Sequence, residues 1–171
     1  MRSLPDPGFA GDDGAADPAL TAALAAYSTD PSSGEAYRAA LAALTGARLL
    51  VPVVAVLGEA EQGADGLTRD KTSDMATVLM RGRDGRLALL AFSGSRSLTA
   101  WDPAARPVPV PAQQAAAAAR QDGAEALVLD VAGPATFVIE SEDLVSLADG
   151  YRLVDLGEGL QWARTSAPGA G

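Results

Sequence analysis

The 171-residue chain contains no cysteine and no histidine. Without cysteine it can form no disulfide and offers no thiol nucleophile. Without histidine it has no imidazole general base and no Ser-His-Asp triad. The two absences together exclude zinc sites built from histidine or cysteine ligands. Any catalytic chemistry would therefore depend on carboxylates, Lys, Arg, Tyr or Ser alone.

Aromatic residues and positive charges are also scarce. Phe, Trp and Tyr make up 5% of the chain, so the core must be mainly aliphatic. The chain has 13 Lys and Arg residues against 22 Asp and Glu, which gives a formal net charge of −9. This acidity argues against nucleic acids and anionic membranes as partners, because both present negatively charged phosphates.

Long apolar runs are missing as well. No stretch approaches the roughly 20 apolar residues that a membrane-spanning helix needs. Residues 1–14 contain two prolines and several acidic side chains where a signal peptide has its apolar region. We therefore expect a soluble, cytoplasmic protein.

The length suits one domain with a core of its own. Residues 1–16 are rich in Gly, Pro and Asp, and we expect this N-terminal segment to be disordered. The folded domain is expected over 17–164. Residues 165–171 are expected to form a disordered tail.

Capping signals and apolar spacing predict several helices. Asp17 and Pro18 suit the N-cap and the first position of a helix. Other expected helices cover 34–45, an alanine-rich stretch after Pro111, a turn over 95–101 and a last helix capped by Ser141, with Gly46, Gly123 and Gly150 at helix ends.

Short apolar runs bounded by turn residues predict strands. Pro52 has no N–H group to donate, so the first strand should lie at a sheet edge, or Pro52 should lie near its start. The expected strands are Leu49–Leu57, Met75–Arg81, Leu87–Phe92, Glu125–Val131 and Thr136–Glu140, with a further short strand within 151–164.

The connections between these strands predict a mixed sheet. Asp84-Gly85 is a hairpin signal that should fold Met75–Arg81 back onto Leu87–Phe92. The alanine-rich helix then suits a crossover to a parallel strand over Glu125–Val131. The predicted fold is a single α/β domain, with α+β as the alternative, in which helices pack on a mixed sheet of about five strands.

The order of four motifs resembles the N-terminal domain of the bacterial SseB family, which is named for enhanced serine sensitivity. The motifs are LLVPVV, FSGSRSLTAW, LVLDVAGP and FVIESEDLVSLA, and the resemblance covers roughly Ala19 to Asp149. Ser93 replaces a family Thr, and Asp130 to Pro134 replace an Asn-Pro-Gly turn. The resemblance implies a fold and supplies no catalytic residue.

The most promising ligand site is the polar stretch Ser93, Gly94, Ser95 and Arg96. It follows a buried strand, and ligands of open α/β sheets bind at that end. Its hydroxyl, N–H and guanidinium groups suit a small anion. The alternative is a simple turn that leaves Arg96 in solvent.

Three other features each have two interpretations. Glu59, Glu61, Asp65, Asp70 and Asp74 could bind a divalent cation through oxygen or form a solvated loop. Asp130 could be a general acid or accept hydrogen bonds from turn N–H groups. Trp101 could anchor a protein interface or fold back onto the sheet.

We therefore favour a non-enzymatic binding or regulatory domain that acts by protein–protein contact or by binding a small anionic ligand. The alternative is a carboxylate- or metal-dependent enzyme that uses the acidic loop 58–74 with Asp130. The sequence predicts no catalytic residue, no bound metal and no cofactor. It leaves the choice between a monomer and a homo-oligomer open.

Overall fold

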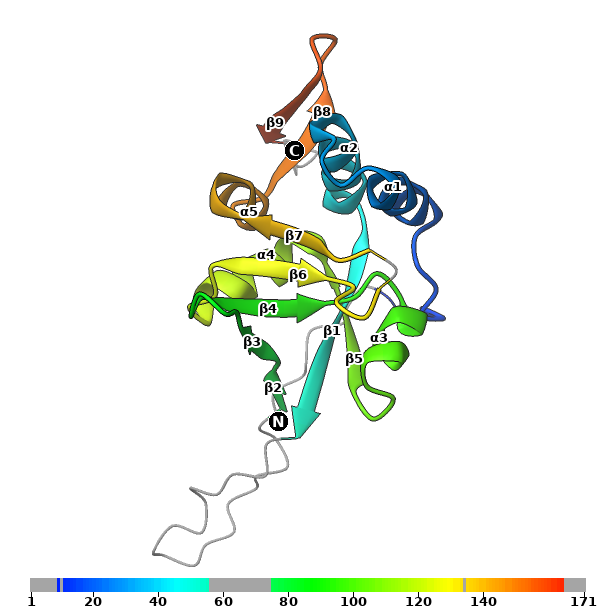
Figure 1. Cartoon of the computed structure of the whole chain (residues 1–171), viewed down its shortest axis with the longest axis vertical. Coiled ribbons are helices and arrows are strands. Elements are labelled where there is room, and N and C mark those ends of the chain that lie inside the picture. The colour runs from blue at the N-terminus through cyan, green and yellow to red at the C-terminus, as the bar shows by residue number, and fades with distance from the viewer. Residues whose placement is uncertain (1–8, 10, 56–74, 134, 165–171) are drawn as a thin grey trace, which may run out of the picture.

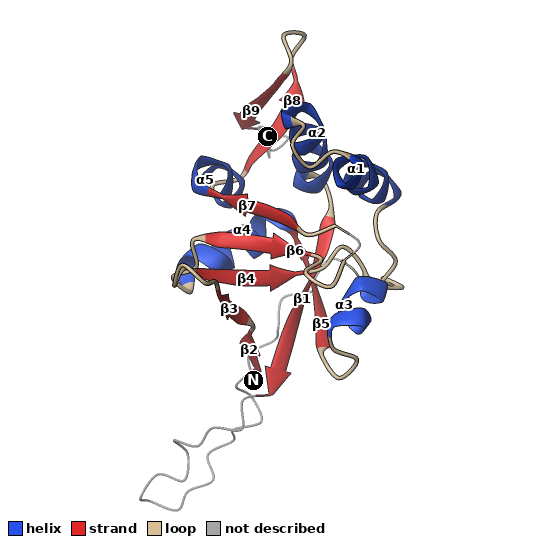
Figure 2. Ribbon diagram, in the orientation of Figure 1, coloured by secondary structure: helices blue, strands red, loops and turns tan. Residues whose placement is uncertain are grey.

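The computed structural model describes residue 9 and residues 11–55, 75–133 and 135–164 (Figure 1). This part of the chain contains five helices and nine strands (Figure 2). The acidic loop 58–74 lies outside the described residues. Among the helices described, none has the length and apolar character needed to cross a membrane.

The helices are α1 (Pro18–Thr29), α2 (Gly34–Thr45), α3 (Ser95–Trp101), α4 (Ala112–Gln121) and α5 (Ser141–Ala148). Asp17 caps α1, as predicted, because its carboxylate accepts hydrogen bonds from the N–H groups of Ala19 and Leu20. Ser33 caps α2 in the same way, through the N–H of Ala36.

All three glycines lie at helix ends as predicted, but Gly46 lacks the expected left-handed conformation, and the predicted cap at Ser141 is wrong. Gly123 and Gly150 have φ of 80° and 91°, the left-handed conformation expected after a helix. Gly46 instead has φ of −100°, because the chain passes almost directly from α2 into a strand. Ser141 is the first residue of α5 rather than its cap, and Glu140 occupies the N-cap position without a side-chain bond.

The strands form three sheets. The strands are β1 (Arg48–Ala55), β2 (Met75–Thr77), β3 (Leu79–Arg81), β4 (Leu87–Ala91), β5 (Arg106–Pro111), β6 (Ala126–Leu129), β7 (Phe137–Glu140), β8 (Tyr151–Asp155) and β9 (Leu160–Arg164). Their orders are β3-β4-β6-β7, β2-β1-β5 and the hairpin β8-β9.

The four-stranded sheet confirms the predicted mixed topology. β3 and β4 form the antiparallel hairpin, and β4 pairs with β6 in parallel, with Leu90 opposite Val128. The alanine-rich helix α4 lies within the crossover between β4 and β6. This sheet has four strands rather than the expected five, because β1 belongs to the second sheet. The predicted strand Met75–Arg81 is also divided at Val78, and its two halves pair in different sheets.

The two larger sheets are joined where β1 meets the end of β4. Leu50 and Phe92 exchange both backbone hydrogen bonds, each 2.8 Å long. β1 lies between β2 and β5, and Pro52 is in its middle, so both predicted alternatives, an edge strand and a place near the strand start, are wrong. Backbone groups alternate in direction along a strand, so Pro52 faces the same side as Leu50. There it lies between the Phe92 bridge and the β2 pairing that begins at Val53, where no donor is required.

The proline-rich stretch 106–111 is extended and forms β5. Pro107, Pro109 and Pro111 alternate along it and pair with β1. Because the backbone groups of Leu50 point at Phe92, its partner Pro109 turns its ring nitrogen to the outer side of β5. Pro107 and Pro111 each lie two residues from Pro109, so their ring nitrogens face the same outer side. The outer edge of β5 therefore lacks three N–H groups and resists pairing with another strand.

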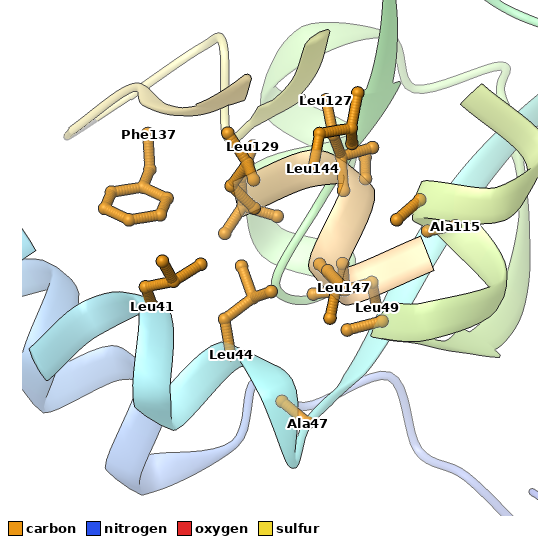
Figure 3. Close-up of a cluster of buried hydrophobic side chains, with 14 of the residues drawn as sticks. Leu41, Leu44, Ala47, Leu49, Ala115, Leu127, Leu129, Phe137, Leu144 and Leu147 are labelled. Carbon is orange, nitrogen blue, oxygen red and sulfur yellow. The ribbon is translucent and has the colours of Figure 1, made fainter. Parts of the chain in front are cut away.

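The core lies on both faces of the four-stranded sheet. One face packs against α1, α2, α4 and α5 and includes Leu89, Leu127 and Phe137. Figure 3 shows part of this cluster, in which the leucines of α2 and α5 meet those of β6. The other face carries Leu90 and Val128, which pack with residues of α3. β4 is buried on both faces, as its unbroken apolar run predicts.

Leu90→Ala should lower the free energy of unfolding by about 2–5 kcal/mol, because Leu90 is only 2% exposed and its removal leaves a cavity. Urea denaturation of both proteins measures this difference. Val145→Ala on the exposed side of α5 is the control, with an expected loss within about 0.5 kcal/mol. A loss for Leu90→Ala no larger than that of the control would contradict this account of the core.

Candidate functional site

Polar residues gather where the parallel strands β4 and β6 end side by side. Ser93 follows β4 after Phe92, and Asp130 directly follows β6. The N–H of Asp130 still donates to the carbonyl of Ala91, at 3.0 Å, so the two strand ends stay in register. We call Ser93–Ser97 together with Asp130 the corner. This is the end of the sheet at which α/β proteins bind ligands.

Asp130 is the centre of the corner. Its side chain is buried, and Asp130 as a whole is 4% exposed. Oδ1 accepts hydrogen bonds from the Ser93 N–H at 2.8 Å and the Ser97 hydroxyl at 2.7 Å, and Oδ2 accepts one from the Ser93 hydroxyl at 2.6 Å. The donors come from the end of β4 and from α3 rather than from Asp130's own turn. These three bonds offset the loss of hydration that burial of the carboxylate costs.

The backbone of Asp130 is in the left-handed region, with φ of 54°. An aspartate tolerates this conformation better than most residues do. Its carbonyl accepts the N–H of Gly133 at 2.9 Å and closes a turn. The left-handed backbone thus ends β6 while the carboxylate is held by β4 and α3.

The corner also binds the segment Asp12–Ala16, which we call the N-terminal segment. The Ser95 N–H donates to the carbonyl of Gly14 at 2.7 Å. A Cβ atom at Gly94 would lie 2.8 Å from the N of Ala16 and 3.0 Å from the O of Gly14. The segment therefore packs backbone to backbone on Gly94, which is possible only because Gly94 has no side chain.

Arg48, the first residue of β1, fastens the N-terminal segment to the corner. Its Nε and Nη2 bind the two carboxylate oxygens of Asp12 at 2.6 and 2.9 Å. The guanidinium also donates to the carbonyls of Ser93, at 3.2 Å, and Ala15. The side chains of Arg48 and Asp12 are only 12% and 15% exposed, so solvent screens this pair less than it screens most surface pairs.

Sequence reasoning missed this arrangement. The stretch expected to be disordered, 1–16, includes the N-terminal segment, which has defined contacts here. Arg48 was assigned to no site. The Asp and Gly residues of the segment are typical of turns as well as of disorder, and no periodic pattern reveals a partner in the tertiary structure.

The structure brings together some of the residues predicted to bind an anion and separates others. The Ser93 N–H donates to the Asp130 carboxylate, and the Ser95 N–H donates to the carbonyl of Gly14. Both N–H groups therefore already have acceptors within the protein. Arg96 is exposed, one residue farther along α3. Binding of a small anion at Ser93–Arg96 stays a prediction, and it would require these internal contacts to be replaced.

Trp101 ends α3 and is half-buried. Its ring centroid lies 5.5 Å from that of Phe92, with the ring planes tilted by 34°. This placement agrees with the interpretation that Trp101 folds back onto the sheet. Its role in a protein interface stays a prediction.

A second polar cluster fastens the β8–β9 hairpin to the helices. Asp143 of α5 accepts hydrogen bonds from the Tyr37 hydroxyl at 3.3 Å and the Trp162 indole N–H at 3.2 Å. Burial, and then the charge of Asp143, raise the pKa of Tyr37 far above its ordinary value, so this phenol remains a donor. The described residues contain no group of three or more Asp or Glu side chains that could hold a metal ion.

Asp130→Asn should lower the free energy of unfolding by about 1–3 kcal/mol, since the amide keeps the shape but cannot satisfy all of the buried donors. Asn also tolerates the left-handed backbone, so the loss reports on hydrogen bonding. Asp149→Asn is the matched control. Asp149 is half exposed, and its Oδ1 lies 3.4 Å from Nη1 of Arg120, an exposed ion pair that should add little to stability. Equal denaturation midpoints for the two variants would show that Asp130 does not hold the corner.

The sequence pattern of the SseB protein N-terminal domain matches residues 20–145. This range runs from α1 into α5 and includes Arg48 and the whole corner, whereas the N-terminal segment lies outside it. No curated protein and no solved structure matches the chain. The pattern covers most of the sequence, in agreement with the predicted resemblance, and the chain belongs to the SseB N-terminal domain family.

Proposed function

We propose that this chain is a non-enzymatic binding domain that acts by protein–protein contact, with the corner as its binding site. One observation carries the proposal: the corner holds a short stretch of polypeptide, the N-terminal segment, which turns at Gly14. The contacts are a two-bond ion pair between Arg48 and Asp12 and a backbone bond between Ser95 and Gly14. A two-bond contact to a carboxylate together with a backbone hydrogen bond is the kind of contact that recognises a peptide.

The state of Asp130 supports binding rather than catalysis. A general acid or base must reach a proton on the substrate. Asp130 is buried, and both of its carboxylate oxygens accept hydrogen bonds from Ser93. The alternative enzyme hypothesis also needs the acidic loop 58–74, which lies outside the described residues.

The contact surface that we propose extends from the corner along α3 to Trp101. Trp101 keeps part of its surface exposed at the end of the helix that begins at Ser95. A large amphipathic ring at this position suits the anchor of an interface. The acidic composition and the lack of cysteine favour a cytoplasmic site of action.

Two probes distinguish peptide binding from anion binding by the full-length protein. The first is a capped peptide with the sequence of residues 11–17, GDDGAAD, and the second is inorganic phosphate. In a ¹⁵N-labelled sample, unlabelled peptide at about 10 mM, above the effective concentration of the tethered segment, should displace that segment and so move the amide resonances of Gly14 and Ala15, while phosphate at the same ionic strength should not. Resonances that respond to phosphate alone would favour the anion site and overturn the proposal.

A further inference from the structure

The N-terminal segment has the features of a ligand that the protein carries with it. We infer that the corner takes peptides that turn at a glycine preceded two residues earlier by an aspartate, and that the N-terminal segment is the built-in competitor for such peptides. This inference rests on the proposed function, because it names the class of partner and the regulation of the same site.

Arg48 supplies the charge selectivity. Its Nε and Nη2 face the two oxygens of Asp12, which is the two-bond geometry that distinguishes a carboxylate from other acceptors. The pair is largely sheltered from solvent, unlike the pair of Arg120 and Asp149, whose side chains are 46% and 48% exposed. A partner peptide needs a carboxylate at this position, since a neutral residue would leave the guanidinium without its counter-ion.

Gly14 and Gly94 supply the shape selectivity. Gly14 has φ of 79°, and a Cβ atom there would lie 2.9 Å from the Ser95 hydroxyl. Its N–H donates to Asp12 Oδ1 at 2.7 Å, so the aspartate that binds Arg48 also fixes the turn that brings the glycine to Ser95. The spacing of Asp and Gly is therefore part of the recognised pattern.

The N-terminal segment can leave without breaking the core. Neither hydrophobic cluster of the described chain contains a residue of the segment. Helix α1 has its own cap in Asp17, which binds the N–H groups of Ala19 and Leu20 and does not depend on the segment. Release therefore costs the contacts to Arg48, Gly94 and Ser95, a local opening of the kind that occurs far more often than global unfolding.

Covalent attachment makes the N-terminal segment a strong competitor. A short tether gives an effective concentration in the millimolar range, so a free peptide must exceed this concentration or bind better. Weakening the segment should raise the affinity for an added peptide by the same factor by which the open state becomes more populated.

The test compares Asp12→Asn with Asp13→Asn in the full-length protein. Both variants remove one negative charge, but within the described part of the chain the Asp13 side chain accepts only the Ala15 N–H and has no bond to Arg48. Asp12→Asn should speed hydrogen exchange of the Ser95 amide about tenfold and tighten binding of the peptide GDDGAAD about tenfold. Asp13→Asn should behave like the wild type in both measurements.

Gly94→Ala tests the shape of the same surface. Its φ of −161° suits any residue, so the added methyl group should block the backbone of the N-terminal segment without straining its own. Ser95 should then exchange rapidly while the peptide fails to bind. Gly34→Ala is the control, because a Cβ there meets no atom within 4 Å, and it should leave both measurements unchanged.

The possible failures point to different errors. Peptide binding that is equally tight in the wild type and in Asp12→Asn would reject the N-terminal segment as a competitor and leave the proposed function standing. Faster Ser95 exchange in Asp12→Asn with no peptide binding to any variant would reject the proposed function. An unchanged Ser95 exchange rate in Asp12→Asn would overturn the inference.

Discussion

The buried carboxylate of Asp130 is the interaction on which the corner depends. A charge with 4% exposure is stable only when nearby groups replace its water, and Ser93 and Ser97 do so with three hydrogen bonds. These bonds fix the end of β4 and the start of α3 relative to the end of β6. The same bonds set the position of Gly94, and through it the surface on which the N-terminal segment lies.

The second constraint is the joint between the two larger sheets. The N–H of Leu50 donates to the carbonyl of Phe92, and the N–H of Phe92 donates to the carbonyl of Leu50. Ser93 is the next residue after this joint. Because Arg48 is only two residues from Leu50 in β1, this joint also brings the guanidinium to the corner. On the other side of β1 lies β5, and the prolines of β5 keep further strands from pairing with its outer edge.

Local signals predicted most of the fold. The hairpin at Asp84-Gly85, the buried strand over 87–92 and the alanine-rich crossover helix are short-range features, and all three are present. Pro52 was placed wrongly because a missing N–H can lie in a gap between two partner strands as well as at an edge. The sequence predicted a polar site after β4, at Ser93–Arg96, but not which residues from other parts of the chain complete it. The crossover from β4 to β6 separates Ser93 from Asp130 in the sequence, so no local pattern predicts that their side chains form a hydrogen bond. The ion pair between Arg48 and Asp12 is likewise a contact between distant parts of the chain.

The order of the strands along the chain has a consequence for how the domain comes apart. β5 lies within the crossover between β4 and β6 of the four-stranded sheet, yet it pairs with β1 of the other sheet. The two sheets are therefore interleaved in sequence, and neither is a continuous piece of chain. No single cut can yield a fragment with one complete sheet and none of the other. The described domain should consequently lose both sheets in one cooperative transition, as an indivisible unit of stability.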